Sequence, residues 1–135
     1  MIVVNAGETR NEEFLRDEEM YVLSDGIANN TIVDEGGILT VYNGGTINIT
    51  YINLGGEVEV LESGTANDTY VWNNGYFLVN EGGSASNTTV DGGNFSLYAN
   101  GVASDTTIKE TGTMRVCADG QLQGSTTVSG GSLIL

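Results

Sequence analysis

Glycine recurs at an almost fixed interval along this chain, and this spacing constrains the fold more than any other feature. Seven glycines lie 19, 19, 19, 19, 18 and 19 residues apart: Gly7, Gly26, Gly45, Gly64, Gly83, Gly101 and Gly120. An aliphatic residue stands four positions before each of them, beginning with Val3, Val22 and Val41. A repeat period of about 20 residues is typical of stacked repeat architectures.

Within each repeat, short runs of alternating apolar and polar residues lie between glycine turns. In one repeat, Met20 and Val22 precede Asp25-Gly26, and Thr31 and Val33 follow it. A period of two predicts β-strands and does not fit a helix. Strands this short are expected to pair with equivalent strands about 4.8 Å above and below. The expected fold is therefore all-β, a single-stranded parallel β-helix (β-solenoid) of about seven 19-residue rungs.

The alternation also assigns side chains to the inside of each rung. A rung of 19 residues is expected to have three sides, the third short and close to a column of alanines. Glycine is expected at the corners because the chain needs positive φ there. The predicted inward columns are Val33, Ile52, Val71, Val90, Ile108 and Val128, and Thr31, Thr50, Thr69, Thr88 and Thr106. The threonines are expected to satisfy backbone groups near a corner.

The two ends of the chain depart from the repeat. Residues 1–19 are acidic, and we interpret them as an atypical N-terminal cap rung that blocks the exposed strand edge of repeats 20–135. The segment from Asn11 to Glu19 is also compatible with a short capped helix. Leu133–Leu135 starts a further rung, so the natural chain is expected to continue or this edge to dock on another molecule.

Composition excludes several functions. Four basic residues face 18 acidic ones, for a formal net charge of -14, which disfavours nucleic acids and anionic membrane surfaces as partners. Histidine is absent, and the single cysteine, Cys117, cannot form an intramolecular disulfide. No apolar run is long enough for a membrane-spanning helix, so direct membrane insertion by this segment is not expected. No signal peptide is visible either, which fits an internal protein or a piece of a longer secreted chain.

One repeat carries a recognisable pattern. Residues 79–93 read Val-Asn-Glu-Gly-Gly-Ser-Ala-Ser-Asn-Thr-Thr-Val-Asp-Gly-Gly. This resembles the 19-residue passenger repeats of the AIDA-I and antigen 43 group of autotransporter adhesins. The resemblance implies a right-handed β-helix, export through an outer-membrane barrel, and a cell-surface or secreted location in a Gram-negative bacterium. It also implies roles in adhesion, aggregation, biofilm formation or virulence.

Aromatic residues mark the one candidate partner-binding site. Tyr51 and Tyr70 stand in the column next to the threonines, and Trp72 lies two residues beyond Tyr70, so all three are expected to point outward. Such rings can stack on sugars or on a protein. They can equally stabilise the exterior of a β-helix without binding anything. A second, mostly apolar column is expected to be buried by a bend or to form an interaction stripe: Val4, Leu23, Tyr42, Leu61, Tyr98 and Cys117.

No pattern indicates catalysis or a cofactor. Asp34, Asp68, Asp91 and Asp105 recur at turns because the repeat places them there, and no irregular segment builds a cleft for paired carboxylates. Solvated charge explains these acids better than a calcium site, so no metal is expected. The outward threonine array is only one residue wide, which does not suit ice binding. The Asn-x-Thr sequons at Asn29, Asn48, Asn67 and Asn87 follow from the repeat itself without any glycan.

These patterns favour a non-enzymatic structural and adhesion module, a fragment of an autotransporter passenger that mediates cell–cell or cell–surface contact. The expected partners are other copies of the chain, or a host or bacterial surface protein or glycan. Two alternatives stay open. One is a glycan-binding or phage-fibre-like β-helix that uses the local aromatic patch. The other is a self-assembling fibre subunit that stacks through Leu133–Leu135.

Overall fold

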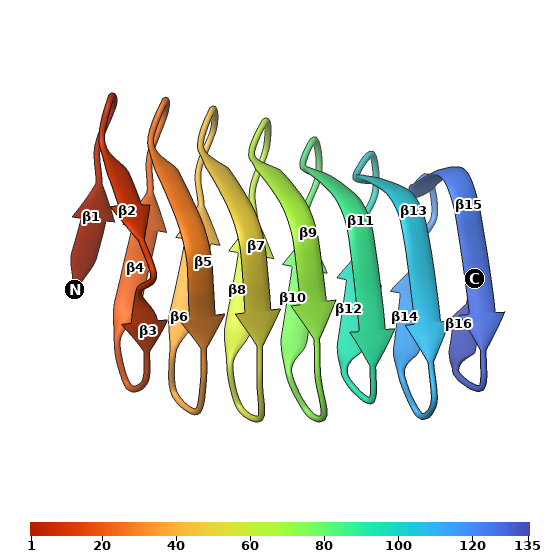
Figure 1. Ribbon diagram of the computed structural model, residues 1–135. Helices are drawn as coiled ribbons and strands as arrows, with labels where there is room; N and C mark the ends of the chain where they lie inside the picture. Colours follow the sequence, from red (N-terminus) through yellow and green to blue (C-terminus); the bar gives the residue numbers. More distant parts are fainter.

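The chain folds into a rod of stacked β-strand coils. The computed structural model describes residues 1–135 and contains strands, turns and no helix, so none is long and apolar enough to cross a membrane. The strands follow one another along the rod, with the N-terminal strands at one end and the last rung at the other (Figure 1). The prediction of an all-β parallel solenoid with about seven coils of about 19 residues is confirmed.

Two parallel sheets form the walls of the rod. The first sheet contains, in order, β1 (Ile2–Val4), β4 (Glu19–Val22), β6 (Ile38–Val41), β8 (Glu57–Val60), β10 (Tyr76–Val79), β12 (Asn94–Leu97), β14 (Thr113–Val116) and β16 (Ser132–Ile134). The second contains β2 (Thr9–Asn11) and β3 (Phe14–Leu15), then β5 (Ile27–Val33), β7 (Thr46–Ile52), β9 (Thr65–Val71), β11 (Ser84–Asp91), β13 (Val102–Lys109) and β15 (Gln121–Ser129). Each strand therefore pairs with its equivalents one rung away.

Each long strand of the second sheet bends at one residue with positive φ. In β5 this residue is Asn30 (φ 55°), and Ala28 and Thr31 on either side of the outward pair 29–30 are both buried. The equivalent residues in the next four rungs are Ile49, Asp68, Asn87 and Asp105. The expected short third side beside the alanine column is the first part of each long strand, before this bend.

The regularly spaced glycines are required for a different reason from the one expected. Gly26, Gly45 and their equivalents do not have positive φ; the residue before each of them does, as the third position of a type II turn requires. A Cβ added to Gly45 would lie 2.6 Å from the carbonyl oxygen of Val22 in the preceding rung. The glycine column is therefore fixed by the close approach of neighbouring rungs.

A single apolar core runs the length of the rod. Of the valine and isoleucine column predicted to point inward, Val33, Ile52, Val71, Val90 and Ile108 are fully buried. Val128 pairs in register with the buried Ile108, but it lies in the terminal rung and is 46% exposed. The largest core side chains, Phe77 and Phe95, stack with ring centroids 4.8 Å apart.

The inward threonine column is confirmed, but the role predicted for its hydroxyls is wrong. Five threonines are at most 1% exposed, and none of their Oγ1 atoms has a hydrogen-bond partner. The backbone groups near this corner already pair with the adjacent rungs, for example Ile32 N–H with the Glu13 carbonyl at 2.9 Å. The hydroxyls therefore do not serve as partners of the backbone at this corner. This column consists of Thr31, Thr50, Thr69, Thr88 and Thr106.

The first rung is built differently from the sequence prediction. Val4, not Val3, pairs with Val22, and Gly7 occupies the positive-φ position that Asp25 has in the next rung. The 19-residue interval between Gly7 and Gly26 thus joins two non-equivalent positions. The capped helix considered for residues 11–19 is also wrong, because β3 in this segment pairs with β5 and buries Leu15.

Two charged residues stand in the inward columns of this first rung. Arg10 pairs in register with Ala28, and Glu13 precedes Phe14 as Thr31 precedes Ile32, so both lie at the open N-terminal end of the core. They form an ion pair with an Nη1–Oε1 distance of 3.2 Å. Charged groups at this end suit the cap predicted for residues 1–19, which stays a prediction.

Changes in repeat length occur only at corners. Three residues, 91–93, lie between Val90 and Asn94, where four residues, 72–75, lie between the equivalent Val71 and Tyr76, and this accounts for the single 18-residue glycine interval. β15 gains one residue at Gly124, where the register with β13 shifts and the Ser125 N–H bonds to the Asp105 carboxylate at 3.0 Å. The inward columns keep their register on either side of these corners.

Candidate functional site

An outward column of large side chains covers one side of the second sheet. Register pairing aligns Phe14 with Ile32, Ile32 with Tyr51, and Tyr51 with Tyr70. In the next rungs the same column contains only threonines, at Thr89, Thr107 and Thr127. We call these seven residues the outer column. Its bulk therefore changes abruptly between Tyr70 and Thr89.

Tyr51 and Tyr70 form the stacked pair that the sequence suggested. Their ring centroids are 5.2 Å apart and their planes differ by 12°, so each ring covers one face of the other. Both side chains are half-buried on the outer surface of the sheet. The remaining face of Tyr70 is directed toward the next rung, where Thr89 is too small to cover it.

Trp72 lies two residues beyond Tyr70, where the chain leaves β9, and is 40% exposed. Its ring does not pair with either tyrosine, so the structure places the three predicted residues on one side of the rod without joining them into one stack. Two residues along a strand are separated by about 6.6 Å. Trp72 therefore stands beside the tyrosine stack and not on it.

Phe14 was missed as a member of this surface. It is 53% exposed and extends the outer column to the first rung. The one-residue register difference in this rung and the helix considered for residues 11–19 concealed it. A signal did exist in the sequence, since Phe14-Leu15 repeats the outward-inward order of Ile32-Val33.

The second apolar column is not buried by a bend, as one interpretation proposed. Tyr42 and Tyr98 are each 37% exposed, Leu23 and Leu61 are half-buried, and Cys117 is exposed. Only Val4 is fully buried, because it belongs to the inward column of β1. Asn80 interrupts the apolar surface between Leu61 and Tyr98, so no continuous apolar stripe forms here.

A ladder of asparagine side chains follows the corner next to the outer column. The Nδ2 group of each asparagine donates to the Oδ1 atom one rung earlier, at 3.0 Å from Asn29 to Asn11, from Asn48 to Asn29 and from Asn67 to Asn48. The Ser86 hydroxyl completes the ladder by donating to Asn67 at 2.8 Å. Three of the sequons therefore begin with an asparagine whose amide is engaged in this ladder.

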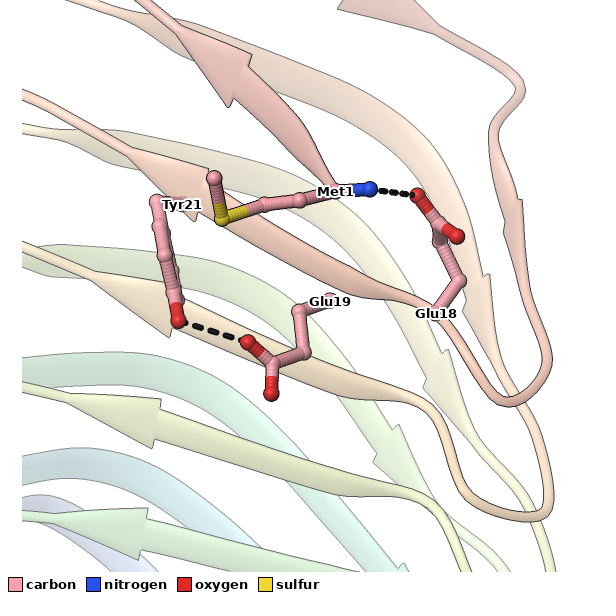
Figure 2. Close-up of polar contacts among 4 residues, drawn as sticks. All are labelled: Met1, Glu18, Glu19 and Tyr21. Carbon is pink, nitrogen blue, oxygen red and sulfur yellow. Dashed lines mark hydrogen bonds and ion pairs between the residues drawn. The ribbon is translucent and has the colours of Figure 1, made fainter.

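Polar contacts on the outer face of the first sheet are local. The Tyr21 hydroxyl donates to Glu19 at 2.6 Å, and this hydrogen bond raises the pKa of Tyr21 above its ordinary range (Figure 2). The same figure shows the N-terminal ammonium group 2.7 Å from Glu18. At the next corner, the Asn5 N–H donates to Glu8 at 2.7 Å and lowers the pKa of that carboxyl.

The rod surface has no pocket. No group of three or more Cys, Asp or Glu side chains is arranged to hold a metal ion. Because the repeat distributes its acids over successive turns, they do not converge. The outer column and Trp72 therefore remain the most distinctive side-chain arrangement on this surface.

No family model matches the sequence, and no curated protein matches it. Among solved structures, the chain is similar to a fragment described as "TibC-catalyzed hyper-glycosylated TibA55-350". The TM-score is 0.66 and the sequence identity 29%, over 98% of this chain and 56% of that one, so this chain spans about half of the fragment's length. This likeness supports an autotransporter-adhesin-like β-helix.

Proposed function

We propose that this chain is a non-enzymatic adhesion module of the AIDA-I and antigen 43 type, displayed on or secreted from a Gram-negative cell. In this role it mediates cell–cell or cell–surface contact, including aggregation and biofilm formation. The observation that carries the proposal is the likeness to the TibA fragment along 98% of the chain. The regular rod adds support, since it presents extended lateral faces and no pocket for a small substrate.

Adhesion by such a rod depends on many weak contacts. Each rung presents a few half-exposed side chains, and display of many rods on one surface multiplies contacts that are individually weak. The net charge of -14 opposes the approach of two copies. Raising the ionic strength from about 0.01 M to about 0.15 M shortens the Debye length from about 30 Å to about 8 Å, so salt is expected to promote association between rods.

The test is display of the chain on beads or on non-adherent bacterial cells. The matched control keeps every inward residue and exchanges outward residues among rungs, so that core and charge are unchanged. We expect aggregation or surface binding by the native rod, an increase with salt, and weaker binding by the control. Equal behaviour of the two rods would refute the adhesion function, and salt-insensitive aggregation would refute the electrostatic argument.

The triple substitution Tyr51→Ser, Tyr70→Ser and Trp72→Ser measures how the contacts are distributed. A partial loss of adhesion is expected if contacts are spread along the rod. Complete loss with an intact fold would show that a single local patch carries adhesion.

A further inference from the structure

The step between Tyr70 and Thr89 leaves an uncovered aromatic ring face on the lateral surface. Tyr51 covers one face of Tyr70, with 12° between the ring planes, and a threonine follows in the next rung. Rungs are about 4.8 Å apart, so a threonine leaves room for a planar or puckered ring against Tyr70. Trp72, 40% exposed, borders the same space about 6.6 Å along the strand.

The two rungs beyond this ring face supply hydrogen-bonding groups without apolar bulk. The strand register places Thr107 after Thr89, and Lys109 after Asp91, on the same outward side. Lys109 forms no ion pair, so its ammonium group and the Asp91 carboxylate both remain free for a ligand. We name this surface the aromatic ledge. It consists of Tyr70, Trp72, Thr89, Asp91, Thr107 and Lys109.

This combination matches the chemistry of a saccharide. A sugar ring has one apolar C–H face, which packs on an aromatic ring, and a rim of hydroxyls, which bond to hydroxyl, carboxylate and ammonium groups. The ledge has one free ring face, and the rungs beyond it carry polar groups. Its apolar area is therefore too small for a protein partner, because a protein–protein interface needs a buried hydrophobic centre. The net charge of -14 opposes anionic glycans and nucleic acids.

We propose that the aromatic ledge binds a neutral saccharide of a cell-surface or matrix glycan. The proposal rests on the adhesion function and gives one of its contacts a chemical class. An open ledge buries little of its ligand, so the affinity of a single site is weak, with a Kd on the order of 1 mM. Display in many copies compensates for this weakness.

The first experiment offers the purified chain, multimerised on streptavidin, to a glycan array that contains neutral, sialylated and sulfated glycans. We expect binding to neutral glycans only. A blank array, or binding confined to anionic glycans, would overturn the proposal. The neutral glycan that binds best then becomes the probe for the variants.

Trp72 is the only tryptophan in the chain, so its fluorescence reports directly on the ledge. Titration with the probe glycan is expected to change this emission. Tyr70→Ser is expected to weaken binding about tenfold, the factor that corresponds to the loss of one aromatic contact. Tyr98→Ser, at a tyrosine that is 37% exposed on another part of the rod, is the matched control and should leave binding unchanged.

A second variant tests the ledge without removing an aromatic ring. Thr89→Tyr extends the tyrosine stack by one rung, covers the free face of Tyr70 and moves the free ring face one rung away from Trp72, so it should weaken binding while preserving the fold. Thr127→Tyr makes the same change two rungs further along the column and should have no effect. Unchanged binding by the Thr89→Tyr variant, with native circular dichroism, would overturn the proposal.

The ledge and the adhesion function fail in different ways. If displayed rods adhere while the array stays blank, the ledge is refuted and adhesion stands. If the array shows neutral glycans bound while displayed rods do not adhere, the ledge stands and the adhesion function is refuted.

Discussion

The buried threonine column offers a direct measure of what the corner hydroxyls contribute. Thr88 and Thr89 are adjacent in β11 but point in opposite directions, since Thr88 is 1% exposed and Thr89 is half-buried on the outer surface. The Thr88 Oγ1 atom has no hydrogen-bond partner. Thr88→Val replaces this hydroxyl by a methyl group of similar shape and leaves the strand propensity unchanged.

We expect Thr88→Val to stabilise the rod. A buried hydroxyl without a partner costs about 1 to 3 kcal/mol relative to its hydrated state in the unfolded chain. A buried methyl group contributes about 0.8 kcal/mol instead. Allowing for imperfect fit in the packed core, the net gain is about 1 to 2 kcal/mol, or about 3 to 6 °C in Tm for a chain of this size. Thr89→Val should change stability by less than about 0.5 kcal/mol.

The measurement is urea unfolding followed by far-UV circular dichroism and by Trp72 fluorescence. Coincident transitions in the two signals are required first, because repeat proteins can unfold in parts. The midpoint should then rise for Thr88→Val at an unchanged m value. A loss of more than about 1 kcal/mol, with Thr89→Val neutral, would refute the reasoning and show that the hydroxyl is hydrogen-bonded in solution.

Three further predictions concern the corners and the first sheet. Ile49 is a β-branched residue with positive φ (55°), so Ile49→Asn is expected to stabilise the rod by about 1 kcal/mol in urea unfolding, and Asn30→Ile to destabilise it by a similar amount. Urea midpoints equal to that of the native chain would contradict this. A Cβ at Gly75 would lie 2.6 Å from the Ile52 carbonyl oxygen, so Gly75→Ala should lower the free energy of unfolding by about 2 kcal/mol or more, whereas Gly7→Ala, at φ 79° in open space, should lower it by only about 1 kcal/mol. The reverse order would show that backbone φ, and not contact between rungs, determines the loss of stability. Because hydrogen bonding to Glu19 raises the pKa of Tyr21, the contribution of this hydrogen bond to stability is complete below pH 10.0 and is lost as the pH rises through the folded-state pKa. Glu19→Gln should shift the tyrosinate absorbance of Tyr21 to lower pH, and identical titrations of the two proteins would refute this assignment.

The sequence predicted the wall of the rod better than its corners. Period-two alternation places Val33 and Thr31 inside whatever the exact shape of the rung, because strand geometry alone decides it. The reason for the glycines was not predictable from composition, since positive φ and close approach both select glycine. The structure distinguishes them: Asp25 has positive φ, and Gly26 lies against the previous rung.

The first rung and the aromatic surface show a second limit of sequence reasoning. Gly7 lies at the expected interval yet belongs to a different column, and strand pairing alone reveals this. The prediction placed Tyr51 and Tyr70 in one outward column, and the stack is present. The same column placed Thr89 after Tyr70, but it could not show that a ring face of Tyr70 stays free, because that depends on ring orientation. Whether Tyr51, Tyr70 and Trp72 bind a partner stays a prediction.

Because changes in repeat length are confined to corners, the length of such a rod can change without disturbing its core. Gain or loss of a single residue is absorbed at Gly124 or at residues 91–93 without disturbing the inward columns. A whole rung, by contrast, carries its own inward columns and corners, so its duplication or deletion restores the same contacts with both neighbours. The reach of the rod can therefore be adjusted in increments of about 4.8 Å by copying a short stretch of gene. The distance between a lateral surface and either end of the rod then varies independently of the residues on that surface.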